Sequence, residues 1–190
     1  MNLIRRIPLL VWVLIPTVLI LGVGIWFFTR PSVLGEKMSE GTGEAKPVAV
    51  DKPVEGTVEF DIVGRNHIAQ GTTGSGYNSN PPTSGPHWDG PAKNGSYDSP
   101  LADEQAIHNL EHGNVWISYK NDVSDDVKNE LKKIVGDDDW KVILSPRDTD
   151  ETKIALAAWG RLLKMDEADY GKVKDFIKTY RNRGPEKTPD

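Results

Sequence analysis

The chain has 190 residues, a hydrophobic fraction of 37%, no cysteine and a formal net charge of -5. Its length allows one domain with appendages rather than two large cores, and the lack of cysteine excludes disulfides, thiolate metal sites and thiol nucleophiles. Any metal ion must therefore be bound by histidine, carboxylate, methionine, backbone or water. The acidic balance and the lack of a basic stripe exclude nucleic acid as an expected partner.

Residues 7–28 form an almost unbroken apolar run that is long enough to span a bilayer. Arg5 and Arg6 precede this run and acidic sequence follows it, so the positive-inside rule predicts a cytoplasmic N-terminus and an extracytoplasmic remainder. A cleavable signal peptide is the alternative, although its apolar core would normally span only ~7–15 residues. We therefore expect residues 1–30 to form a cytoplasmic stub and a single, uncleaved transmembrane anchor.

Residues 31–56 combine proline, glycine, charged and small residues and contain no aromatic side chain. This composition is typical of a flexible linker, because it cannot form a core. An alternation of apolar and polar residues over 57–62 then predicts a half-buried strand. We place the folded, extracytoplasmic domain at residues 57–186, followed by a short tail at 187–190.

A long segment at residues 71–100 consists mainly of glycine, proline, serine, asparagine and threonine. Disordered segments are poor in aromatic residues, whereas this one contains Tyr77, Trp88 and Tyr97. We therefore expect an ordered loop that is folded over the surface of the domain, with its prolines fixing its path. The three aromatic side chains either pin the loop to the domain or line a ligand pocket.

The stretch from Ser99 to Gly113 predicts a short helix that ends where a strand begins. Ser99 is the expected N-cap and Pro100 the first helical residue, while Gly113 supplies the left-handed conformation that ends the helix. His108 and His112 are one helical turn apart on the same face. Their imidazoles can therefore reach a common point.

Local patterns in the rest of the chain predict a strand at 114–119, a helix that Ser124 caps and Gly136 closes, a strand at 140–145, a strand at 153–159 and a helix from Asp166 to residues 183–185. Because a helix joins the strands at 114–119 and 140–145, we expect these two to be parallel. The sum is an α+β domain: a small mixed sheet of about four strands with two to three packed helices, preceded by one transmembrane helix.

All four histidines of the chain fall between residues 67 and 112. Imidazole is the commonest metal-binding side chain, and three or four imidazoles with a nearby carboxylate satisfy zinc or copper without thiolates. The bends of the loop would bring the two earlier histidines to the helix. We expect His108 and His112 at the centre of the site, His87 as the third ligand, His67 as a possible fourth and Glu111 as an orienting partner or an occasional ligand.

Residues 108–112 also fit the pattern H-x-x-E-H of inverted zinc proteases, in which the glutamate activates a water molecule. Two features disfavour this interpretation. Gly113 ends the helix at once, and no downstream helix offers an obvious acidic third ligand. A zinc-dependent hydrolase therefore ranks third among our hypotheses, and whether the protein is an enzyme is left open.

Five segments of the domain follow one another in a characteristic order: NHIAQG, YNSNPPTSGPHWDGP, HNLEHGNVWISYK, ALAAWGRLLKMD and YRNRGPE. Together they resemble an uncharacterised bacterial family, the domain-of-unknown-function family numbered 3105, over about residues 58–186. The resemblance implies a small protein with an N-terminal membrane segment, in agreement with the anchor at 7–28. It implies no activity, and its histidine-bearing blocks coincide with the four histidines of this chain.

Our leading hypothesis is a membrane-anchored, extracytoplasmic domain with a histidine-rich site for zinc or copper, serving metal capture, delivery or sensing. The second hypothesis is a non-catalytic interaction module that docks an envelope glycan or a protein through the loop with Tyr77, Trp88 and Tyr97. The membrane is the only partner that the sequence indicates directly, through residues 7–28.

Overall fold

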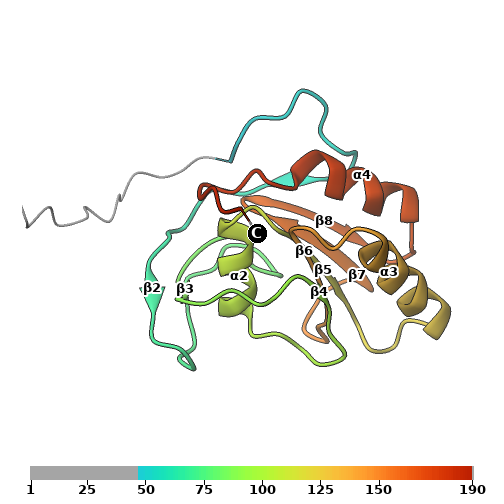
Figure 1. Ribbon diagram of the computed structural model, residues 1–190, viewed down its shortest axis with the longest axis horizontal. Helices are drawn as coiled ribbons and strands as arrows, with labels where there is room; N and C mark the ends of the chain where they lie inside the picture. The colour runs from blue at the N-terminus through green and yellow to red at the C-terminus, as the bar shows by residue number, and fades with distance from the viewer. Residues whose placement is uncertain (1–46, 190) are drawn as a thin grey trace, which may run out of the picture. The chain divides into compact units, whose positions relative to one another are not determined.

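In the computed structural model, which describes residues 47–189, a six-stranded mixed sheet forms the centre of the fold (Figure 1). The strand order is β1-β8-β7-β5-β6-β4, with β1 (Val58–Glu59), β4 (Gly95–Ser96), β5 (Val115–Tyr119), β6 (Val142–Pro146), β7 (Ile154–Ala158) and β8 (Arg161–Met165). Strand β5 is parallel to β6 and antiparallel to β7. The predicted α+β class and the parallel pair are confirmed, but the expected number of strands is too small.

Strand β8 is the main element that the sequence analysis missed. It forms a tight hairpin with β7, and Gly160 in the turn has a φ of 66°, a conformation that favours glycine. Arg161 is 6% exposed and pairs with Glu59 at 3.1 Å. This buried charge interrupts the apolar pattern by which a core strand is recognised.

The described part of the chain contains three helices: α2 (Asp103–Glu111), α3 (Asp125–Asp137) and α4 (Tyr170–Tyr180). Ser124 caps α3 as predicted, its side chain accepting from the backbone N–H of Val127. The two other predicted starts are wrong. The N-cap residue of α2 is Ala102, which has an extended backbone, and not Ser99. Helix α4 is capped by Asp169 and not by Asp166, and Asp169 accepts from the N–H of Lys172 at 3.0 Å.

The predicted closure of α3 at Gly136 is also wrong, because this residue lies inside the helix, which continues to Asp137. Gly113, in contrast, has a φ of 88° just after α2, as its predicted role requires. Its N–H donates to the carbonyl of Leu110 at 2.9 Å. Among the helices of residues 47–189, the end of α2 is therefore the one boundary that a glycine fixes.

The sheet has a hydrophobic cluster on each face, because alternate residues of a strand point to opposite sides. One cluster contains Ile117 and Leu156 with the apolar residues of α3 and α4. The other contains Trp116 and Ala157 with the apolar residues of α2. Helix α2 therefore packs on the face opposite α3 and α4, where the segment 71–100 surrounds it.

Part of the segment 71–100 is buried, although we expected a loop on the surface of the domain. It contains β3 (His87–Trp88), which pairs in parallel with β2 (His67–Ile68) in a second, two-stranded sheet, and Thr83, Ser84 and His87 are completely buried. The middle of the loop, residues 81–87, is therefore largely buried in the domain, whereas most of its other residues are exposed or half-buried, as expected of a surface loop.

The aromatic residues of the segment hold it in shape. The hydroxyl of Tyr77 donates to the carbonyl of Pro86, Nε1 of Trp88 donates to the carbonyl of Thr72, and the hydroxyl of Tyr97 donates to the carbonyl of Lys93. Tyr77 and Tyr97 also pack against the cluster on the α2 face. These contacts match the expectation that the aromatic residues pin the loop.

The two ends of the described chain lie against the domain. Val50 and Val54 pack on the core cluster of α3 and α4, and Thr188 accepts a hydrogen bond from Nζ of Lys141 at 2.7 Å. Within residues 47–189, no helix is long and apolar enough to cross a membrane. The predicted anchor at 7–28 and the first part of the predicted linker lie outside the described residues.

Candidate metal centre

Two elements of the second sheet and one helix bring the four histidines together. His67 in β2 and His87 in β3 are paired neighbours in the parallel register, and their ring centroids are 4.8 Å apart. Helix α2, which lies next to β3 (Figure 1), contributes His108 and is followed by His112. A short strand pair with no apolar periodicity thus positions half of the cluster.

His67, His87 and His108 form a triad in which one ligand atom of each residue lies within 4.8 Å of the others. The centroid of the His108 ring is 5.2 Å from that of each of the other two rings. His87 is 0% and His108 5% exposed, whereas the side chain of His67 is 44% exposed. The triad therefore has a buried base and one side open to solvent.

Backbone carbonyls orient two of these rings. Nδ1 of His87 lies 2.8 Å from the carbonyl oxygen of Gly85, and Nδ1 of His108 lies 2.5 Å from that of Trp88. A carbonyl only accepts, so each Nδ1 donates its proton and each Nε2 is the nitrogen left for another partner. A backbone acceptor on the far nitrogen is the arrangement that fixes the tautomer of metal-binding histidines.

Glu111 lies at the base of the triad and is 1% exposed. Its Oε1 accepts from Nε of Arg65 at 2.6 Å, and its Oε2 lies 2.9 Å from Nε2 of His87 and 3.8 Å from Nε2 of His67. Burial acts to raise the pKa of Glu111, but the hydrogen bonds and charges of His87 and Arg65 outweigh it and lower this pKa to about 2. The site therefore contains a carboxylate that is ionised near pH 7.

His112 lies beside the triad rather than within it. Its Nε2 is 3.0 Å from Nε2 of His108 and 3.4 Å from Oε2 of Glu186. We expected His112 at the centre of the site and His67 as a possible fourth ligand. In the structure His67 is a member of the triad, and His112 is its neighbour. The i,i+4 spacing correctly predicts that His108 and His112 are close, but it does not reveal on which side of His108 the other two rings lie.

Two residues that contact the histidine cluster were missed by the sequence analysis, namely Arg65 and Glu186. Arg65 links Glu111 to Glu186: its Nε donates to Glu111, and its Nη2 donates to Oε1 of Glu186 at 3.1 Å. Glu186 comes from the C-terminal segment, 121 positions away from Arg65 in the chain. No local pattern in the sequence marks either residue. Glu104, one helical turn before His108 in α2, accepts from the N–H of Gly74 at 2.7 Å.

The donor set fits a metal ion of borderline softness. Three imidazoles and a carboxylate are ligands for zinc, and imidazole also suits copper. Burial, supported by the neighbouring His112 and His87, lowers the pKa of His108 in spite of its hydrogen bond to Trp88. Its ring is therefore neutral near pH 7, which is the form that binds a metal.

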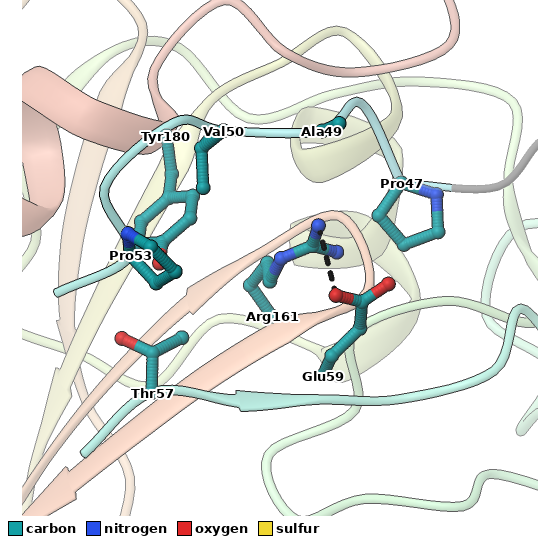
Figure 2. A pocket seen from close by; sticks show the side chains of 8 residues that line it. All are labelled: Pro47, Ala49, Val50, Pro53, Thr57, Glu59, Arg161 and Tyr180. Atoms are coloured by element: carbon teal, nitrogen blue, oxygen red, sulfur yellow. Dashed lines mark ion pairs between the residues drawn. The ribbon is translucent and has the colours of Figure 1, made fainter. Parts of the chain in front are cut away.

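A separate cavity of about 260 Å³ lies under residues 47–57, against β8 and α4 (Figure 2). It is lined by Pro47, Ala49, Val50, Pro53, Thr57, Glu59, Arg161 and Tyr180. Its buried guanidinium already pairs with a carboxylate within the same wall, that of Glu59. The cavity shares no residue with the histidine cluster, and its lining contains no imidazole.

Residues 67–190 of the chain match a protein family described as "Protein of unknown function (DUF3105)". No curated protein and no solved structure matches the chain. The matched region begins at His67 and includes every histidine and both glutamates of the site, whereas Arg65 lies just before it.

Proposed function

Because the chain belongs to the DUF3105 family, whose description assigns no activity, we propose from the site itself that this protein is a metal-binding domain. His67, His87 and His108 hold a zinc or copper ion, with Glu111 beside it. The observation that carries this proposal is the triad, whose three ligand atoms lie within 4.8 Å of one another. Zinc–nitrogen bonds of about 2.0–2.1 Å require only a small inward movement of such rings.

The charge of the site favours a cation. Glu111 is ionised and almost completely buried, and a buried charge is stable only when it is paired. Arg65 occupies Oε1, while Oε2 faces Nε2 of His87 and Nε2 of His67. A metal ion among these three atoms would satisfy the second carboxylate oxygen and both imidazoles together.

The exposure of His67 favours an exchangeable ion. Structural zinc sites are closed by four protein ligands, whereas catalytic sites keep one coordination position open to water or substrate. The side chain of His67 is 44% exposed, in contrast to the completely buried His87. This asymmetry supports capture, delivery or sensing of the ion rather than a purely structural role.

Hydrolysis through the H-x-x-E-H pattern is less well supported. A general base needs a pKa near the working pH and contact with a water molecule. The pKa of Glu111 is lowered to about 2 and both of its oxygens contact side chains of the site. Docking through the aromatic loop also lacks support, because Trp88 and Tyr97 use their polar groups within the loop.

We further propose that the domain is held outside the cytoplasm by a single membrane anchor at residues 7–28. The support is the apolar run itself, with Arg5 and Arg6 before it, which by the positive-inside rule places the N-terminus in the cytoplasm. A reporter enzyme that is active only outside the cytoplasm, fused after residue 190, should be active. An inactive reporter in a stably produced fusion would contradict this topology.

Metal analysis of the full-length chain tests the central proposal. After loading with Zn²⁺ and removal of free ion, we expect one ion per chain in the wild type and its loss in His67→Ala. His67 is the best position for substitution because it is exposed, so the variant should fold. Asn66→Ala, at the exposed neighbouring position, is the matched control and should retain the ion. A folded His67→Ala protein with full metal content would contradict the proposal, as would a wild type without metal.

A further inference from the structure

We infer that the histidine cluster contains two overlapping metal stations that share one nitrogen atom, Nε2 of His108, and that a single ion passes between them. The first station is the triad of His67, His87 and His108. The second consists of His108, His112 and Glu186 and is called here the His112 station. This inference rests on the proposed function and adds to it a route by which the ion enters and leaves.

The geometry of the His112 station suits a metal ion. Nε2 of His112 lies 3.0 Å from Nε2 of His108 and 3.4 Å from Oε2 of Glu186. Two nitrogen ligands about 2.1 Å from one ion lie roughly 3.0–3.4 Å apart, depending on the angle between the bonds. The two Nε2 atoms already have that separation.

Arg65 gives each station a carboxylate oxygen of its own. Its Nε donates to Oε1 of Glu111 and its Nη2 donates to Oε1 of Glu186. The second oxygen of Glu111 faces His87 and His67, and the second oxygen of Glu186 faces His112. One guanidinium thus orients two carboxylates toward two different sets of imidazoles.

Backbone hydrogen bonds hold Glu186 in place. Its N–H donates to the carbonyl of Glu111 at 3.1 Å, and the N–H of Asn182 donates to the carbonyl of Gly113 at 2.7 Å. The C-terminal segment is therefore anchored to the end of α2, and Glu186 is positioned by the same helix that carries His108. Its side chain is 41% exposed, so this station also reaches solvent.

The two stations exclude one another because His108 offers a single free nitrogen. Its Nδ1 donates to the carbonyl of Trp88, and the one lone pair of Nε2 binds one ion. An ion can leave His67 and His87 and bind His112 and Glu186 without ever leaving His108. The triad has one more imidazole and should hold the ion at equilibrium, while the His112 station lowers the barrier to uptake and to release.

Kinetics of Zn²⁺ exchange test this inference in the full-length chain. We expect His112→Ala and Glu186→Gln to slow both uptake from a zinc buffer and release to a chromophoric chelator by about tenfold, the smaller of the losses in metal affinity or activity that follow removal of a supporting group. Both variants should weaken Zn²⁺ binding far less than His67→Ala does, because the triad stays complete. Glu167→Gln, at an exposed position in the turn before α4, is the matched control and should exchange like the wild type.

Each other outcome has a distinct meaning. Unchanged exchange rates in a His112→Ala protein that binds one ion would overturn the second station and leave the proposed function intact. Two ions bound per wild-type chain would overturn the shared nitrogen. A loss of affinity in His112→Ala equal to that in His67→Ala would show one four-histidine site and also overturn the inference. A wild type that binds no Zn²⁺ would overturn the proposed function and this inference with it.

Discussion

Nε2 of His87 lies 2.9 Å from Oε2 of Glu111, and both side chains are at most 1% exposed. Nδ1 of His87 already donates to the carbonyl of Gly85. Since a carboxylate only accepts, the contact is satisfied by a second proton on the ring or by a metal ion bound to both atoms. In the proposed metal-bound protein, this pair is therefore the point of the site where the metal ion would replace a proton.

We predict that Glu111→Gln lowers Zn²⁺ affinity by about 10–100-fold, because it retains the shape of the side chain and removes the buried charge. Isothermal titration of the full-length variant with Zn²⁺ measures this effect. Glu104→Gln is the matched control, since Glu104 is a buried glutamate of the same helix that contacts the N–H of Gly74 instead. Equal affinities of the two variants would exclude Glu111 from the metal site.

The chain shows which part of such a site the sequence reveals. His108 and His112 were recognisable because helical spacing is a local property, and the strands β5 and β6 with α3 between them follow local periodicities. His67 and His87 meet through a two-residue parallel pair, which has no periodicity. Their approach was expected from the shortage of histidines elsewhere, but their order in the site was not.

Long-range ion pairs could not be predicted either, because they also have no local sequence pattern. Arg65 contacts two carboxylates that are 46 and 121 positions away in the chain, and nothing in their neighbourhoods distinguishes them from solvated charges. Arg161 had a different effect: because this buried residue is charged, the core strand β8, which begins with it, was not predicted. Where a charge is buried by a distant partner, hydrophobic periodicity no longer reports burial.

We predict that the stability of the metal-free protein falls in two separate ranges of pH. Burial lowers the pKa of His108 from its ordinary value of 6.5, so the unfolded state binds this proton first and stability declines as the pH falls below about 6.5. The lowered pKa of Glu111, about 2 instead of 4.5, means that its contribution is present above about pH 4.5 and is lost between there and pH 2.

Urea denaturation of the metal-free, full-length chain at a series of pH values measures both declines. His108→Asn removes the titrating ring and offers an amide to the carbonyl of Trp88, so it should flatten the decline just below pH 6.5 and leave the acidic one unchanged. Glu111→Gln should do the reverse. An identical decline below pH 6.5 in the wild type and in His108→Asn would contradict the assignment.

Gly184 tests the attachment of the C-terminal segment to α2. A Cβ atom at this position would lie 2.1 Å from the carbonyl oxygen of Glu111 and 2.3 Å from the backbone nitrogen of Gly113. Either the backbone around Gly184 or the backbone at the end of α2 must therefore move. We predict that Gly184→Ala destabilises the protein by about 1–3 kcal/mol. It should also slow Zn²⁺ exchange, because the movement displaces Glu186.

Gly136 is the matched control for that substitution. A Cβ atom there meets nothing within 4 Å, and the residue lies in α3, so Gly136→Ala should stabilise the protein by up to about 0.5–1 kcal/mol. Chemical denaturation of the two variants under the same conditions provides the comparison. Equal stabilities would mean that the C-terminal segment adapts freely and does not fix Glu186.

Arg147 joins the start of α2 to the rest of the domain. Its Nε and Nη2 donate to the two carboxylate oxygens of Asp103 at 2.8 and 2.7 Å, and its Nη1 donates to Asp150 at 2.5 Å and to Asn80 at 2.6 Å. The side chain of Asp150 is completely buried. Arg147 thus contacts the helix that carries His108 and the loop that carries His87.

We predict that Arg147→Met destabilises the protein by about 3–5 kcal/mol, because it leaves the buried carboxylate of Asp150 without its cation. Adding Asp150→Asn should recover part of this loss by removing the unpaired charge. Lys128→Met is the matched control: its partner Asp125 is 91% exposed, and exposed pairs contribute little, so no measurable change is expected. If Arg147→Met were as stable as Lys128→Met, Arg147 would not determine how α2 is held, and the triad would depend on β2 and β3 alone.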